Sequence, residues 1–210
     1  LDDFFFDQTY TYVLGATRPR QSAQAEGATA QVVNLNIRRK VADLPIAGMP
    51  HLGSGITFAW NGTTVLASPN LQGGAIDVVD MKSWKPVRTI ATPGPGFFMR
   101  SHENSRHAWV DSMMSPQNKD TLTVIDKQTL EVVAQLKPVP GKTLAHIEFT
   151  KDGKHALASL WENDGAIIVF DAVIVDVSAR ELYDFVSVER KCNIGIPSPI
   201  ASFDIFGFEV

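Results

Sequence analysis

One pattern of short strands recurs along the chain at a nearly fixed interval, and this repeat constrains the fold more than any other feature. In each copy an apolar strand ends on Asp or Asn, and a turn and a further strand are expected to follow. The residues that end the first strand are 46, 46 and 45 positions apart, and they are Asn34, Asp80, Asp126 and Asp171. About four short strands fit into each interval, which is typical of a β-propeller blade. The sequence therefore predicts an all-β fold, a partial β-propeller of about four blades.

Turn residues within the repeat agree with this interpretation. Asn61-Gly62 and Asp152-Gly153 stand between apolar stretches in two of the units. The turns that join adjacent antiparallel strands favour residues that tolerate positive φ, so these dipeptides predict hairpins. Asp80 and Asp126 are predicted to cap the turns that follow their strands.

Composition narrows the class of protein further. Apolar residues make up 44% of the chain and charged residues 20%, an ordinary globular balance. The net charge of -4 gives no reason to expect a nucleic-acid partner. No apolar run approaches the roughly 20 residues that span a bilayer, so no membrane span is expected. Cys192 is the single cysteine, which excludes an intrachain disulfide and a Cys-x-x-Cys motif.

The loops that lead into the innermost strands of successive units carry histidine and glycine. Imidazole can ligate iron, donate a hydrogen bond to an anion or transfer a proton near neutral pH. Glycine lets a flat ligand approach the backbone, and arginine can pair with a carboxylate. These residues predict one pocket for a planar, carboxylated macrocycle, and they are His51, Gly53, Gly55, Arg100, His102 and His146. The alternative for each histidine is a solvated loop side chain without function. His107 and His155 are predicted to lie on the surface, and no residue is assigned as a metal ligand.

Four segments make the chain similar to a known family. They resemble the d1-heme domain of cytochrome cd1 nitrite reductase and, more closely, its paralogues in d1-heme biosynthesis, the dihydro-heme d1 dehydrogenase branch. The resemblance covers residues 1–172 and is carried by residues 1–6, 48–55, 97–104 and 108–111. It implies part of an eight-bladed propeller that binds heme d1 as its cofactor.

The resemblance also implies roles for the three histidines. His51 and His102 match residues on the distal side of heme d1 that donate hydrogen bonds or protons to a small anion such as nitrite. His146 has no counterpart in the reductases and looks like a feature of the dehydrogenase branch, where it would help to remove a proton from the macrocycle's side chain. All three are therefore catalytic candidates and, together with Gly53, Gly55 and Arg100, cofactor-binding candidates.

Several functions follow from this resemblance. The leading hypothesis is a heme d1-binding fragment of a nitrite reductase-like oxidoreductase of denitrification. The alternatives are a dihydro-heme d1 dehydrogenase or heme d1 carrier in d1 biosynthesis, a non-catalytic binding propeller, and a non-functional fragment. The family implies a periplasmic location and, for the complete protein, a homodimer and an electron-donor protein as partners. Its proximal iron ligand and c-type heme domain have no match here, so the chain alone is expected to be inactive and to bind heme d1 weakly.

The repeat does not continue after Asp171. The last nine residues, Ser202–Val210, are similar to the switch II segment of myosin motors. No phosphate-binding loop accompanies them, so they cannot support nucleotide hydrolysis. We therefore expect a partial propeller domain over residues 1–172 and an unassigned tail over 173–210, which is either a foreign join or similar to myosin by chance.

Overall fold

A computed structural model of the chain describes residues 2–17, 30–163, 165–172 and 186–188, and it places sixteen strands in four antiparallel sheets. The first sheet contains β1 (Asp3–Phe6), β2 (Tyr12–Ala16), β3 (Ala30–Asn34) and β4 (Arg39–Leu44). The second contains β5 (Ile56–Trp60), β6 (Thr63–Pro69), β7 (Ala75–Asp80) and β8 (Pro86–Ala91), preceded by a 3-10 helix, η1 (Leu52–Ser54). The third contains β9 (Met99–Ser101), β10 (His107–Asp111), β11 (Leu122–Asp126) and β12 (Glu131–Leu136). The fourth contains β13 (Leu144–Phe149), β14 (His155–Leu160), β15 (Ala166–Asp171) and β16 (Val186–Val188).

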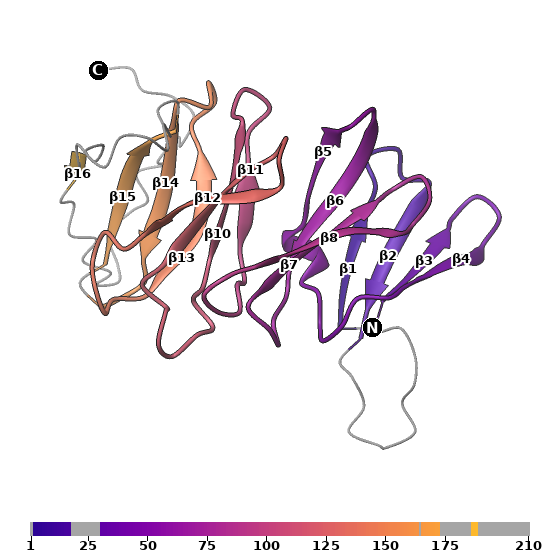
Figure 1. The fold of residues 1–210 in the computed structure, drawn as a ribbon, viewed down its shortest axis with the longest axis horizontal. Helices are drawn as coiled ribbons and strands as arrows, with labels where there is room; N and C mark the ends of the chain where they lie inside the picture. The colour runs from indigo at the N-terminus through magenta and orange to yellow at the C-terminus, as the bar shows by residue number, and fades with distance from the viewer. Residues whose placement is uncertain (1, 18–29, 164, 173–185, 189–210) are drawn as a thin grey trace, which may run out of the picture.

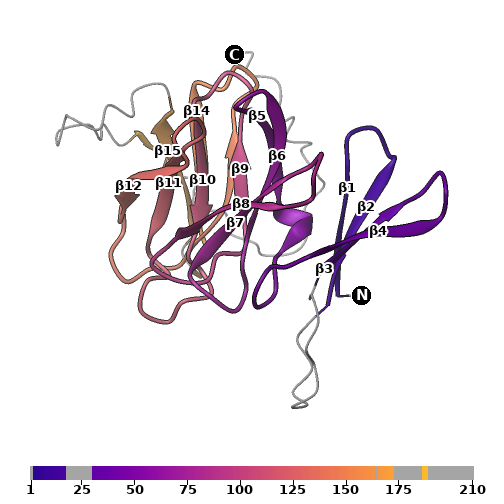
Figure 2. The same ribbon diagram turned by 45° about the vertical axis from the view of Figure 1, so that its right-hand side comes forward.

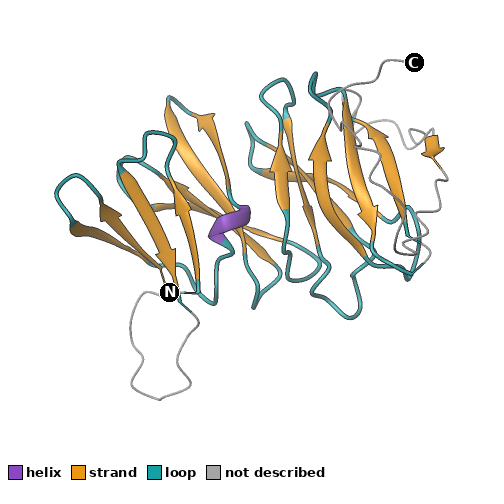
Figure 3. Ribbon diagram, turned by 180° about the vertical axis from the view of Figure 1, so that it is seen from behind, coloured by secondary structure: helices purple, strands orange, loops and turns teal. Residues whose placement is uncertain are grey.

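Each sheet is one blade, because its strands pair in chain order. The blades stand side by side in the order of the sequence, and the first and fourth lie at the two ends of the row (Figures 1 and 3). The predicted all-β partial propeller is therefore confirmed.

The residues that define the repeat cap the turns after their own strands. The side-chain oxygen Oδ1 of each accepts hydrogen bonds from the backbone N–H groups two and three residues further on; the three residues are Asn34, Asp80 and Asp126. The residue four positions after each has a positive φ of 55–58°, in Arg38, Trp84 and Leu130. Because the cap uses only local groups, the same turn recurs in three blades and explains the spacing.

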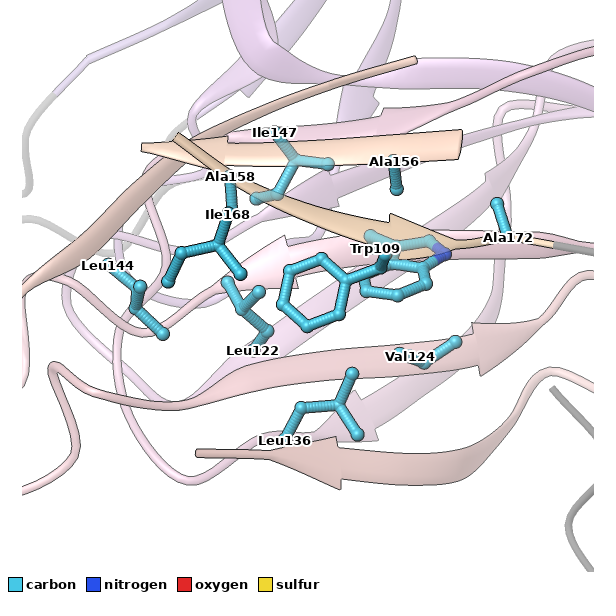
Figure 4. Packing of buried hydrophobic residues seen from close by; sticks show 11 residues of the cluster. Trp109, Leu122, Val124, Leu136, Leu144, Ile147, Ala156, Ala158, Ile168 and Ala172 are labelled. Carbon is cyan, nitrogen blue, oxygen red and sulfur yellow. The ribbon is translucent and has the colours of Figure 1, made fainter. Parts of the chain in front are cut away.

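The hydrophobic core lies between neighbouring blades. Three clusters of buried side chains occupy the three interfaces between consecutive sheets. In the cluster between the third and fourth blades, Trp109 is 1% exposed and its ring centroid lies 5.3 Å from that of Phe170 (Figure 4). Each blade is therefore held mainly by its neighbours, because a single four-stranded sheet has two faces to bury.

The first strand of each blade brings the site together. β9 contacts both β5 and β13, and β1 contacts η1, so these segments form one continuous inner edge. Figure 2 shows β9 beside β5, with the short helix η1 between them and β1. The loops that enter β5, β9 and β13 open at the same end of this edge, because the strands run in equivalent directions in consecutive blades.

The sequence predicts His107 on the surface, and this prediction is wrong. The residue is 7% exposed, and burial lowers its pKa below the usual range.

β16 pairs with β15 and supplies the outer strand of the fourth blade from within the 173–210 segment. The rest of that segment, with the Ser202–Val210 end, lies outside the described residues, and the division at residue 172 stays a prediction. Within the described ranges, no helix is long and apolar enough to cross a membrane.

Candidate functional site

His51 is fixed at the entrance to the second blade by contacts from three segments. Its backbone N–H donates to the Pro69 carbonyl at 2.7 Å, and its ring Nδ1 lies 2.6 Å from the Phe97 carbonyl oxygen. Because a carbonyl oxygen only accepts, Nδ1 is the donor and carries the proton. Nε2 is left for proton exchange, 4.0 Å from Asp3 Oδ2, in a side chain that is 16% exposed.

The loop before His51 is held by a buried amide. The Asn70 Nδ2 group donates to the Ala47 carbonyl at 2.6 Å, and its Oδ1 accepts from Met49 N–H at 3.3 Å and Gln72 N–H at 3.0 Å. Gly48, at φ +70°, lets the chain approach Asn70 so closely that a Cβ there would lie 2.8 Å from Oδ1. The amide thus ties the incoming loop to the turn between β6 and β7.

Four aromatic and imidazole rings form a continuous line across three blades, which we call the ring row: His51, Phe97, Phe98 and His146. Consecutive ring centroids are 4.1, 4.8 and 4.4 Å apart. The last pair, Phe98 and His146, is stacked with an interplanar angle of 9°. The row places two histidines at its ends and two apolar rings between them.

His146 projects from an irregular point of its strand. The register of β13 against β14 shifts between Ala145 and Ile147, so His146 is the extra residue of a β-bulge, and its φ is +60°. Bulges turn a side chain away from the regular strand direction and occur often beside active sites. The His146 side chain is 53% exposed, and its Nε2 lies 3.8 Å from Glu148 Oε1. The same oxygen accepts from Arg100 Nε at 3.1 Å, which links the third and fourth blades.

Below the ring row lies a buried carboxylate that sequence reasoning did not select. Asp111 is 0% exposed and accepts backbone hydrogen bonds from Phe97 at 2.8 Å and Phe98 at 3.0 Å. Burial raises its pKa above the usual range, although these N–H groups act in the opposite sense. The available signal was its place directly after the apolar run Ala108-Trp109-Val110.

The structure places His51 and His146 at the two ends of the ring row and links Arg100 to His146 through Glu148, but it places His102 elsewhere. His102 follows the last residue of β9 and therefore lies at the far end of that strand from Phe98. Its Nε2 is 3.1 Å from the Lys151 carbonyl, and a Cβ on Gly153 would lie 2.4 Å from its Nδ1. Its side chain is thus held by the turn between β13 and β14.

The two glycines of the predicted pocket are packed against their own chain. Gly53 N–H donates to Asp3 Oδ2 at 3.0 Å, and a Cβ there would meet Asp3 Oδ1 at 2.8 Å. A Cβ on Gly55 would lie 2.9 Å from the Leu52 carbonyl oxygen. Their contact with a cofactor stays a prediction. Within the part of the chain that the structure describes, no group of three or more His, Cys, Asp or Glu side chains is placed to hold a metal ion.

Comparison with known proteins identifies the family. The cytochrome D1 heme domain matches residues 1–181 of the chain. The chain belongs to this family. It is 48% identical over 172 residues to the dihydro-heme d1 dehydrogenase of Pseudomonas aeruginosa. The aligned region covers 82% of this chain and 33% of that protein. It is 26% identical over 140 residues to the nitrite reductase of Stutzerimonas stutzeri. That aligned region covers 59% of this chain and 23% of the reductase.

A solved structure gives the same relationship. The dihydro-heme d1 dehydrogenase NirN in complex with DHE matches with a TM-score of 0.74 and 48% identity over 81% of this chain and 35% of that chain. The chain thus spans about a third of the length of this relative. The predicted family and propeller are confirmed, and the identities favour the biosynthetic alternative over the nitrite reductase hypothesis.

Proposed function

We propose that this chain forms part of the pocket for a d1-type heme in a dihydro-heme d1 dehydrogenase-like protein. The ring row carries this proposal, because it lies at the inner edge of the blades in a member of the d1 heme domain family. The relative that shares 48% identity with the chain was solved in complex with DHE, which supports a ligand of this class.

The donor set at the site fits one side of such a ligand. A d1-type heme is planar and carries carboxylates, so it needs apolar rings against its plane and cationic or N–H donors at its edge. Phe97 and Phe98 would contact the macrocycle, while His51, His146 and Arg100 would face its polar groups. When bound, the macrocycle supplies the conjugated ring and the iron.

Two residues of the chain are suited to proton transfer. Dehydrogenation of a saturated carbon–carbon bond releases two protons and two electrons, and the electrons pass to an external redox partner. We assign the protons to Nε2 of His51 and Nε2 of His146, because imidazole is the usual proton-transfer group in enzymes and each of these nitrogens has a carboxylate oxygen within 4.0 Å. The catalytic and cofactor-binding role of His102 stays a prediction.

The experiment compares three single variants in the longer protein that contains this chain. His51→Ala and His146→Ala are each expected to lower the rate of dihydro-heme d1 oxidation by about 10²–10⁴-fold, the usual contribution of general acid–base catalysis. His155→Ala, in an exposed strand position away from the ring row, is the matched control. Unchanged oxidation rates in both test variants would refute the assignment, whatever their heme affinity.

Nitrite reduction remains the second candidate function, supported by the identity to a nitrite reductase. His51 would then donate to the small anion, and nitrite turnover by the same variants would distinguish the two activities. From the family resemblance we also propose a periplasmic location, a homodimer and a redox protein partner for the longer protein.

A further inference from the structure

The buried carboxylate of Asp111 accepts hydrogen bonds from the loop that carries Phe97 and Phe98, the two central rings of the ring row. Its Oδ1 accepts from Phe97 N–H at 2.8 Å and Met113 N–H at 3.2 Å, and its Oδ2 accepts from Phe98 N–H at 3.0 Å. β10 also packs against β13, the strand that carries His146. One side chain of the third blade thus fixes the loop into β9, whose Phe98 ring stacks on His146.

Burial of the Asp111 carboxylate costs free energy unless the group is hydrogen-bonded. It is fully buried at the end of β10, and burial opposes its ionisation. Backbone N–H groups that point at an ionised carboxylate form stronger hydrogen bonds than those to a neutral acceptor.

We propose that Asp111 is a positioning residue that sets the stacking of His146 on Phe98. By accepting from the N–H groups of Phe97 and Phe98 it fixes the loop that carries the Phe98 ring next to the bulge of the fourth blade. The rings of Phe98 and His146 then meet at 4.4 Å and 9°. The inference deepens the proposed function. Only its expected effect on turnover rests on that function.

Asp111→Asn is the informative substitution. The amide keeps the size of the side chain but replaces one acceptor oxygen by an NH₂ group, which cannot accept from an N–H. The variant therefore loses either the hydrogen bond from Phe98 N–H or those from Phe97 N–H and Met113 N–H. Asp126→Asn is the matched control, because Asp126 is also buried, in the same sheet, and accepts backbone N–H bonds from Gln128 at 2.7 Å and Thr129 at 3.0 Å at the opposite end.

The measurement uses the ligand-free chain. The stacked Phe98 ring should shift the NMR signals of the His146 imidazole protons, and Asp111→Asn should move those signals toward the values of the exposed His155. Amide exchange at Phe97 and Phe98 should rise by about tenfold or more through local opening. Asp126→Asn should leave both readouts of the ring row unchanged. In the longer protein, Asp111→Asn should lower kcat for dihydro-heme d1 oxidation more than it raises KM.

Two results would overturn the proposal. The first is a pattern in which Asp111→Asn leaves the His146 signals unchanged, or Asp126→Asn moves them equally. The second is global unfolding of both Asp111→Asn and the smaller variant Asp111→Ser where Asp126→Asn folds, because Asp111 would then support the whole sheet. These readouts need no heme, so their failure is distinct from failure of the heme proposal.

Discussion

A methyl group added at Gly153 is expected to displace the His102 ring from its contact with the fourth blade. An alanine Cβ at this position would lie 2.4 Å from His102 Nδ1 and 2.8 Å from its Cγ, closer than real Cβ contacts allow. The His102 ring is the group that would move, because it is the end of a side chain that directly follows β9. Its displacement would break the contact of Nε2 with the Lys151 carbonyl and the hydrogen bond that Asn104 N–H donates to Nδ1.

The expected destabilisation has two parts. Gly153 has a φ of +73°, and an L side chain in the left-handed region costs roughly 1–2 kcal/mol. The two lost hydrogen bonds cost about 0.5–1.5 kcal/mol each, toward the lower end because His102 is partly exposed. Gly153→Ala should therefore lower the free energy of unfolding by about 2–4 kcal/mol. Gly141→Ala is the matched control, because Gly141 has a φ of +79° and no atom within 4 Å of an added Cβ.

Urea unfolding of the two variants measures the difference. Gly141→Ala should cost only the backbone part, about 1–2 kcal/mol, so the variants should differ by about 1–2 kcal/mol. The NMR signals of His102 should move in Gly153→Ala, while those of His51 and His146 should stay in place because they lie at the other end of the inner strands. Equal destabilisation, or a shift of the His51 and His146 signals, would refute this placement of His102.

Two further predictions concern the turns that shape the blades. The Thr63 hydroxyl and the Ser83 N–H lower the pKa of Asp80 to about 2, so its contribution to stability is present above the ordinary value of 3.8 and is lost as the pH falls toward 2. Allowing for solvent exposure this is about 1 kcal/mol; thermal unfolding of Asp80→Asn should show a shallower loss of stability between those pH values, and an unchanged slope would contradict it. Asn70→Ala should lower the free energy of unfolding by about 2–4 kcal/mol, because it leaves the Ala47 carbonyl and the Met49 N–H without their buried partner. Amide exchange at Met49 should rise in that variant; the exposed Asn104→Ala should have little effect on either quantity, and equal effects of the two would count against the role of Asn70.

The blades could be predicted from the sequence because their determinants are local. Asn34, Asp80 and Asp126 cap turns within three residues of themselves, so the same chemistry is visible as a period in the sequence. At Asn61-Gly62 both residues have positive φ, 46° and 80°, as the hairpin prediction requires. Local turn chemistry of this kind does not depend on the rest of the fold.

The site was only partly predictable, because its contacts join distant residues. His51 and His146 were selected from their loops, but the contact of His51 with Phe97 spans 46 residues and that of Asp3 with Gly53 spans 50. His102 was grouped with them since it follows Phe98 closely in the sequence. β9 is an extended strand of three residues, and the five steps from Phe97 to His102 cover roughly 16 Å at about 3.3 Å per residue. A short distance in sequence thus crosses the whole inner strand.

The separations of these contacts show how the repeat builds the site. Asp3 meets Gly53, His51 meets Phe97, and Arg100 meets Glu148 across 46–50 residues, which is close to the length of one blade. Each contact therefore joins similar positions in adjacent blades, and no blade contains the ring row by itself. The geometry of the row depends on how neighbouring blades pack, through clusters such as the one around Trp109. A cavity in such an interface should disturb the stacking of His146 on Phe98 even where the strands of each blade remain paired, because the rings are aligned by the angle between the sheets.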